Sequence, residues 1–316
     1  MNKIVRWYNQ NRKVIFITIG IIVFLFGLLQ LLNNMSKNNL ENKEKNKDEN
    51  TILLNQNNEL ISDKSAVTGD EISENKLIED TQIIKQFMEA CNNKNIEAAY
   101  NLLTDECKEE MFPNIDDFIE IYYLPNFEKQ EKNFNIENWI KNTYKVTIIG
   151  DVISTGKIDE TNKKQDYITI INKEDGYKLN INNYIGRKEI NKETKSNNVN
   201  IKVEAKDIYM DYEMYKIVVE NNSEKSILLD TGNKSNTIYL LDSNDMKYYF
   251  NNNILQNKLI INNGFKKGYR IKFGNSYSST RKIDKMVFSN MVLNYDEFKN
   301  IENKDDYKYF CYQVDI

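Results

Sequence analysis

The hairpin DYITIINKEDGYKLNIN, residues 166–182, decides how the first folded part of the chain is built. Both arms are rich in residues that favour strands, and a turn that ends at Gly176 separates them. In the second arm Tyr177, Leu179 and Ile181 alternate with polar residues, so that one face of the strand is apolar. This alternation predicts an antiparallel sheet with one buried face and one solvated face.

Helical patterns precede this hairpin and a further β-rich run at residues 144–149. Apolar residues recur at helical spacing over three segments between residues 83 and 123, where they form one face of each predicted helix. Asp80 is expected to cap the first helix, because its carboxylate can accept hydrogen bonds from the free N–H groups at a helix start. Helices followed by antiparallel strands predict an α+β domain over residues 80–190, with the helices packed on a curved sheet.

The segment KNIEAAYNLLT, residues 94–104, followed by antiparallel strands, resembles the nuclear-transport-factor-2-like fold, an α+β cone. This resemblance implies a domain of a superfamily that includes enzymes, small-molecule binders and structural domains. Several bacterial examples resemble this layout of one membrane anchor and a cone, among them scaffold subunits of secretion and conjugation channels. Enzymes of this fold place an Asp/His or Asp/Tyr pair in the cone. The chain has no histidine, and no acid lies on the apolar faces of the predicted helices, so that this role is not carried over.

Four aromatic residues of the cone are candidates for the lining of a ligand pocket. They are Tyr122, Tyr123, Trp139 and Tyr144. The alternative is that these rings belong to an ordinary core, and this is the preferred interpretation, because aromatic side chains at helical or strand spacing usually pack against one another.

Strand patterns dominate residues 199–316, where short β-rich runs are separated by turn clusters. Such a pattern predicts an antiparallel β-sandwich. The order of its strands and turns resembles immunoglobulin-like domains of bacterial envelope proteins, which implies a role in contacts or as a spacer. Residues 191–198, between the two predicted domains, are polar and are expected to form a linker.

A basic stretch lies within the predicted sandwich. Its cations are Arg270, Lys272, Arg281, Lys282 and Lys285, and aromatic residues are interleaved with them. This stretch could meet an acidic envelope polymer or the acidic face of a partner. The preferred interpretation is a solvated sheet face in a protein rich in lysine.

An uncharged apolar run begins at Val14 and ends at Leu32. At about 1.5 Å per residue the run is long enough to cross a bilayer, so it predicts one transmembrane helix through which the chain contacts the lipid bilayer. A cleaved signal peptide is the alternative, but no small-residue cleavage site follows the run. Basic residues within residues 1–13 favour a cytoplasmic N-terminus, with the folded domains outside. Residues 33–79 are polar and lack aromatic side chains, which predicts a flexible stalk.

The composition excludes several kinds of site. Of 316 residues none is histidine and three are cysteine, which excludes His-based catalytic and metal sites and a disulfide-rich scaffold. The three cysteines are expected to be unpaired and buried. A net charge of -4 gives no electrostatic footprint for nucleic acid. We therefore expect no catalytic residues, no cofactor, no metal and no nucleic-acid partner.

The complete prediction is an α+β chain with an N-terminal transmembrane helix, an α+β cone domain and a C-terminal antiparallel β-sandwich. Its expected function is that of a single-pass, extracytoplasmic structural or interaction protein, for example a scaffold of a secretion, conjugation or cell-envelope assembly, with protein partners in the envelope. The alternative is a membrane-tethered protein that binds a small molecule or an envelope polymer in the cone pocket. An enzyme ranks third, because no acid–base pair or phosphate-binding loop is recognisable.

Overall fold

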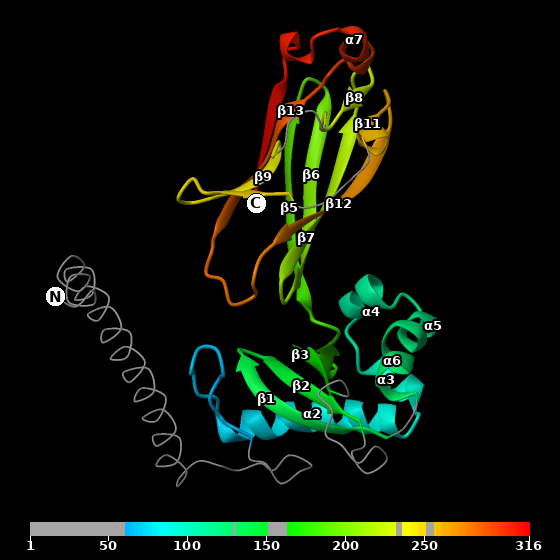
Figure 1. Ribbon diagram of the computed structural model, residues 1–316, viewed down its shortest axis with the longest axis vertical. Helices are drawn as coiled ribbons and strands as arrows, with labels where there is room; N and C mark the ends of the chain where they lie inside the picture. Colours follow the sequence, from blue (N-terminus) through cyan, green and yellow to red (C-terminus); the bar gives the residue numbers. More distant parts are fainter. Residues whose placement is uncertain (1–60, 129–130, 151–162, 232–235, 251–255) are drawn as a thin grey trace, which may run out of the picture. The chain divides into compact units, whose positions relative to one another are not determined.

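The computed structural model describes residues 61–128, 131–150, 163–231, 236–250 and 256–316 (Figure 1). All of them belong to one compact unit. Two hydrophobic cores lie within this unit.

Short helices and a four-stranded antiparallel sheet surround the first core. The helical elements are α2 (Glu74–Asn92), α3 (Ile96–Asn101), α4 (Asp105–Met111), α5 (Ile115–Phe118), the π-helical turn η1 (Ile119–Tyr123) and α6 (Leu124–Phe127). The sheet follows chain order and consists of β1 (Asn133–Ile140), β2 (Thr143–Ile149), β3 (Lys163–Lys173) and β4 (Gly176–Asn180). In Figure 1, α2 runs along this sheet. Leu77, Ile84 and Phe87 of α2 are buried in the same core as Ile136 and Val146 of the sheet.

The hairpin predicted at residues 166–182 is confirmed as β3 and β4, which pair from Thr169 and Asn180 to Lys173 and Gly176. Gly176 has a φ of 120°, a backbone conformation that other residues rarely adopt. The start of α2 differs from the prediction. The helix begins at Glu74 after Ser73, and Asp80 is a buried residue inside it rather than its N-cap.

Two further antiparallel sheets enclose the second core. One has the order β12-β7-β6-β5, with β5 (Tyr184–Ser196), β6 (Val199–Tyr209), β7 (Tyr212–Asn221) and β12 (Lys266–Gly274). The other has the order β10-β9-β13-β14, with β9 (Ile238–Asp242), β10 (Lys247–Tyr249), β13 (Ile283–Met291) and β14 (Phe310–Asp315). Smaller elements complete this part, namely β8 (Ile227–Leu228), η3 (Gln256–Leu259), β11 (Ile260–Ile261), α7 (Tyr295–Asn300) and η4 (Lys304–Asp306). Apolar side chains of both sheets meet in this core, as in a β-sandwich.

The ladder of β5 and β6 enters both cores. Tyr184 at the start of β5 and Tyr209 at the end of β6 belong to the first core, whereas Val199 and Val203 belong to the second. The expected linker at residues 191–198 is therefore replaced, for the most part, by strand β5, which pairs with β6 as far as the turn. Most residues of this stretch are exposed, because β5 is an edge strand of its sheet. Charged residues are common on such edges, and this gave the strand the composition of a linker.

The predicted fold class, α+β, was wrong. Strands hold 45% of the described residues and helices 24%, and the larger sheets form sandwich-like layers. The helical patterns at residues 96–127 led to an overestimate of the helical content, because the helices there are only 4 to 7 residues long. In the part of the chain that the structure describes, no helix is both long enough and apolar enough to cross a membrane. The predicted span, residues 14–32, lies outside the described residues.

The described part of the predicted stalk is folded. Ile61 and Leu77 are 1% exposed and belong to the first core. The backbone N–H of Ala66 donates to the carbonyl of Asn138 in β1, at 2.9 Å. Residues 33–60 of the predicted stalk lie outside the described residues. The cysteines also differ from the expectation, since Cys311 is exposed.

Candidate functional site

Three of the four aromatic residues predicted for a pocket lie in the first core. Tyr122 is 2% exposed, Tyr123 5% and Tyr144 0%. Trp139 lies elsewhere. Its ring centroid is 5.3 Å from that of Tyr167, and it lies on the face of the sheet opposite to Tyr144. The structure therefore does not bring the four side chains together around one space.

Buried aspartates accept hydrogen bonds from two of these tyrosines. The Tyr122 hydroxyl donates to Oδ2 of Asp166 at 2.8 Å, and the Tyr144 hydroxyl donates to Oδ2 of Asp80 at 2.8 Å. Burial, together with the charge of the aspartate that each faces, raises the pKa of both tyrosines. The expectation that no acid lies on the apolar faces was wrong, because Asp80 points into the core from α2. Sequence spacing offers a signal for it, since Asp80 is four residues from Ile84.

Asp166 is held by the backbone as well as by Tyr122. The backbone N–H groups of Asn182 and Asn183 donate to its two carboxylate oxygens, at 3.1 Å and 3.0 Å. Burial raises the pKa of Asp166, although these hydrogen bonds act in the opposite direction. Asp166 is 5% exposed, and its carboxylate is surrounded by its hydrogen-bond partners. The side chain therefore stabilises the fold.

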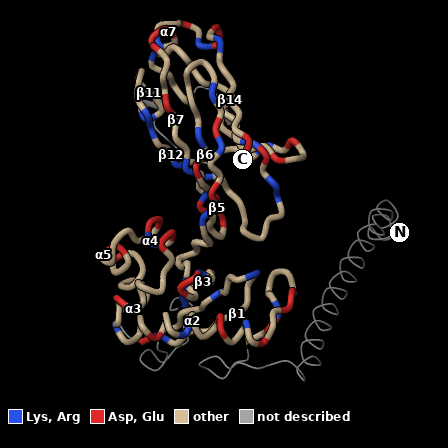
Figure 2. The backbone as a smooth tube through the Cα atoms, turned by 180° about the vertical axis from the view of Figure 1, so that it is seen from behind, with Lys and Arg blue, Asp and Glu red and all other residues tan. Residues whose placement is uncertain are grey.

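An ionic cluster joins helix α4 to the sheet that contains β5, β6, β7 and β12. Its members are Glu109, Glu110, Arg187, Asp207, Lys216 and Arg270. The acidic residues of α4 are visible in Figure 2. Because the acids of α4 lie within ion-pair distance of cations on the sheet, the cluster ties the two to each other.

The most buried carboxylates of the ionic cluster are Asp207 and Glu110, whose side chains are 0% and 1% exposed. Asp207 accepts hydrogen bonds from Arg187 Nε at 2.8 Å and from the Tyr184 hydroxyl at 2.9 Å. Glu110 accepts one from the Tyr209 hydroxyl at 2.6 Å. Burial alone would lower the pKa of Arg187, but its hydrogen bonds to the carboxylates outweigh this and raise it. The charges of the cluster thus compensate one another in the interior.

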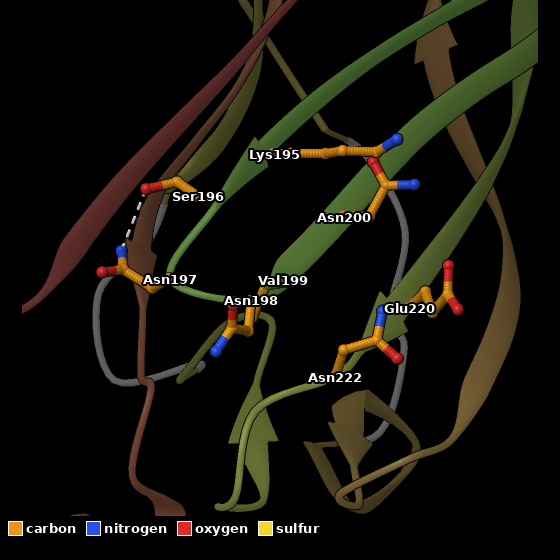
Figure 3. Close-up of a pocket in the computed structure, with 8 residues that line it drawn as sticks. All are labelled: Lys195, Ser196, Asn197, Asn198, Val199, Asn200, Glu220 and Asn222. Atoms are coloured by element: carbon orange, nitrogen blue, oxygen red, sulfur yellow. Dashed lines mark hydrogen bonds between the residues drawn. The ribbon is translucent and has the colours of Figure 1, made fainter.

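A cavity of about 510 Å³ lies at the turn between β5 and β6 (Figure 3). We name it the amide cavity, because four asparagine side chains line it. Its lining residues are Lys195, Ser196, Asn197, Asn198, Val199, Asn200, Glu220 and Asn222. Asn197 and Asn198 occupy the two turn positions with φ values of 48° and 58°, which asparagine tolerates better than most residues. The two-residue turn therefore fixes where the cavity lies.

The groups of the amide cavity are only partly engaged with each other. Asn197 Nδ2 donates to Ser196 Oγ at 3.1 Å, as drawn in Figure 3, and the backbone N–H of Asn222 donates to the Asn198 carbonyl at 2.8 Å. Asn200 Nδ2 donates to Glu193 at 3.1 Å, whereas its Oδ1 is buried without a hydrogen-bond partner among the described residues. The asparagine side chains of the lining are therefore not all satisfied by one another.

The side chains of the amide cavity are suited to hydrogen bonding rather than to proton transfer. Amide side chains donate and accept hydrogen bonds at neutral pH, and they do not exchange protons. Glu220 is the single carboxylate among the lining residues, and Ser196 is the single hydroxyl side chain. The Ser196 hydroxyl accepts a hydrogen bond from an amide rather than facing a base, so the lining lacks the arrangement of an activated nucleophile. The composition of this turn, Ser-Asn-Asn, signals a turn but gave no indication of a cavity.

No family model matches the chain, and no curated protein matches it. A solved structure of a conserved hypothetical protein from Bacillus anthracis is similar to part of it. The sequence identity is 12%, the match covers 39% of this chain and 94% of that chain, and the TM-score is 0.25. A likeness at this level establishes neither a shared fold nor a shared function.

Proposed function

We propose that the chain is an interaction protein that holds a partner and does not transform a substrate. The observation that carries this proposal is the β5–β6 ladder, which enters both hydrophobic cores without an intervening linker. A hydrogen-bonded ladder, even with the two register shifts of the β5–β6 pairing, resists bending better than a flexible connection does. Such a construction suits a protein that presents its binding surfaces at fixed positions.

The buried carboxylates support the same proposal. Asp80, Asp166 and Asp207 are at most 5% exposed, and each accepts a hydrogen bond from a tyrosine hydroxyl. A general acid or base has to reach the proton that it transfers, directly or through one water. Carboxylates enclosed in this way contribute to folding, and a substrate has no access to them.

A second candidate function is the binding of a polymer rich in hydroxyl groups, such as a carbohydrate chain, in the amide cavity. The lining favours it, because four amide side chains supply donors and acceptors, and the lysine and the glutamate of the lining offset each other in charge. This candidate takes the amide cavity as its site in place of the predicted cone pocket.

Site-specific crosslinking tests the first proposal. A photoreactive residue placed at Asn222, which lines the amide cavity, is compared with the same residue placed at the exposed Glu302, and both full-length proteins are irradiated in their native cells. We expect a discrete crosslinked protein species at Asn222 and none at Glu302. The oligomeric state of the purified full chain is measured in parallel by sedimentation. A strictly monomeric chain that yields no discrete species from Asn222 would contradict the proposal.

Calorimetric titration with a panel of neutral oligosaccharides tests the second candidate. Asn200→Ala combined with Asn222→Ala removes two amides of the cavity, and Asn244→Ala removes an exposed amide from another turn. Saturable binding to the wild type that the double variant weakens, and that N244A leaves unchanged, is the expected result. Equal binding by all three proteins, or none by the wild type, rejects this candidate.

A further inference from the structure

A second cavity, of about 230 Å³, lies beside the inner face of the sheet that contains β5, β6 and β7. Four cationic side chains line it, and we name it the basic pocket. Lys188 comes from β5, Lys206 from β6, and Arg281 and Lys282 from the segment that leads into β13. Tyr215 of β7 and three isoleucines complete the lining, which contains no carboxylate side chain among the described residues. Cations from three parts of the chain thus meet at one small space.

Two β-bulges place the lysines of this pocket. The pairing of β6 with β7 shifts between Val203 and Ala205, and the pairing of β5 with β6 shifts between residues 189 and 192. Beyond these bulges Lys206 stands directly opposite both Lys188 and Tyr215. Bulges re-aim side chains and occur often near functional sites. Like charges that face each other across a ladder are unfavourable unless they are compensated. Within the described ranges Lys206 is compensated by Glu213, whereas Lys188 has no ion-pair partner.

Arg281 is held in a fixed orientation at the basic pocket. Its side chain is only 8% exposed. One terminal nitrogen donates to the carbonyl of Gly274 at 3.0 Å and the other to Oε2 of Glu213 at 3.3 Å, while the guanidinium carbon lies 4.4 Å from the centre of the Tyr248 ring. Its Nε is buried and has no hydrogen-bond partner among the described residues. A buried donor without an acceptor is unfavourable unless a water or a ligand accepts from it.

Two carboxylate side chains lie close to these cations but do not neutralise all of them. Glu213 lies 2.6 Å from the Lys206 ammonium and 3.3 Å from Arg281. Although burial would raise it, these two cations lower the pKa of Glu213. Hydrogen bonds from backbone N–H groups, with a contribution from the charge of Arg281, lower the pKa of Asp242. Both acids are therefore ionised at neutral pH, and Glu213 holds the buried Lys206 and Arg281 in place through its two ion pairs.

The exposed lysines leave the pocket with an excess of positive charge. Lys188 and Lys282 have no ion pair within the described ranges of the chain, so four cations face two carboxylate side chains. An anionic ligand would balance the excess. A guanidinium with a free N–H beside ammonium groups is the combination that recognises phosphate oxygens.

We infer that the basic pocket binds a phosphate group of a small ligand. The inference is independent of the proposed function, because it concerns a different cavity and no partner protein. A free phosphate or phosphate ester and the headgroup of a phospholipid share this chemistry, and the experiment below distinguishes these sources. The volume of about 230 Å³ suits a phosphate or a diphosphate.

The test measures binding of three probes to the purified full chain. Inorganic phosphate and pyrophosphate are titrated by calorimetry, and vesicles of equal parts phosphatidylglycerol and phosphatidylcholine are used in a sedimentation assay. The test variant is K188Q/K282Q, and the control is K192Q/K247Q, which removes two exposed lysines at other places of the same sheets.

We expect saturable binding of at least one probe by the wild type. The K188Q/K282Q variant should bind it about tenfold more weakly, and K192Q/K247Q should stay within about twofold of the wild type. Loss of pyrophosphate or phosphate binding assigns the site to a soluble ligand, and loss of vesicle binding alone assigns it to a lipid headgroup. Absence of binding for all three probes, or equal binding by both double variants, would overturn the inference. If the double variant does not fold, the binding test is repeated with Lys188→Gln alone, after its unfolding midpoint has been shown to equal that of the wild type.

Discussion

Replacement of Asp207 by alanine tests whether the ionic cluster and the β5–β6 ladder hold the two cores as one unit. The Asp207 side chain is 0% exposed, accepts hydrogen bonds from Tyr184 and Arg187, and lies 3.2 Å from the Lys216 ammonium. Its removal takes one carboxylate partner from Arg187 and from Lys216, and it leaves the buried Tyr184 hydroxyl without its acceptor. Loss of one partner from a buried ion pair costs about 3–5 kcal/mol. We therefore expect D207A to lower the free energy of unfolding by about this amount.

Two fluorescent probes make the assay specific for each core. Trp7→Phe leaves Trp139 in β1 as the single tryptophan, and a fluorophore on the exposed Cys311 in β14 reports on the second core. Urea unfolding should give coincident transitions for both probes, in D207A and in the parent protein, because the ladder couples the cores. Glu204→Ala is the control on the same strand, since its side chain is 42% exposed and lies 3.8 Å from Lys202. We expect it to change stability by less than about 0.5 kcal/mol.

Two results would refute this reasoning. A loss below about 1 kcal/mol for D207A would mean that the ionic cluster contributes no more than an exposed ion pair does. Separate transitions for the Trp139 and Cys311 probes would mean that the cores unfold independently.

Three further predictions concern single residues. Asn198→Val should lower the melting temperature by roughly 2–4 °C, because a β-branched residue is strained at a φ of 58°. Asn198→Gly should stay within about 1 °C of the wild type. Scanning calorimetry of the three proteins measures both differences. Burial raises the pKa of Asp166, so the wild type should lose stability relative to Asp166→Asn as the pH rises from the ordinary aspartate pKa through the raised one. Urea titrations of both proteins from about pH 4 to pH 7 measure this difference. A loss of stability in D166N, relative to the wild type, that grows with pH would contradict the prediction. Burial raises the pKa of Cys107 to about 12 and also raises that of Cys91. A thiol reagent should therefore modify only the exposed Cys311 of β14 until denaturant is added. Fast labelling of all three thiols in the native state would contradict the burial of Cys91 and Cys107 in the first core.

Local patterns predicted the strands and turns well, because each depends on neighbours in the sequence. The β-rich run at residues 177–181 identified β4, and Gly176 identified the turn before it. The predicted solvated face was wrong at Asn180, which is 2% exposed and donates to the carbonyl of Ile185. Most β-rich runs after residue 199 correspond to strands of the two sheets around the second core, and the runs at residues 226–230 and 258–261 correspond to β8 and β11. Burial on one face leaves a period of two in the sequence, which is why these elements could be recognised.

Features that depend on distant contacts could not be predicted in the same way. Strand β5 is polar along most of its length because it lies at an edge, so its composition resembled that of a linker. The burial of Asp166 depends on Tyr122, which is 44 residues away in the sequence. The basic pocket depends on two bulges and on Arg281, which reaches Glu213 across 68 residues. The spacing of residues in one sequence does not indicate such long-range contacts.

Hydrogen exchange measured by mass spectrometry on the full chain tests the central claim most directly, namely that the β5–β6 ladder makes the two cores one folded unit. The account predicts that peptides from α2, from residues 188–205 of the ladder and from β13 exchange through the same global opening, with similar protection. Rapid exchange confined to residues 188–198, with separate protection of α2 and β13, would contradict it.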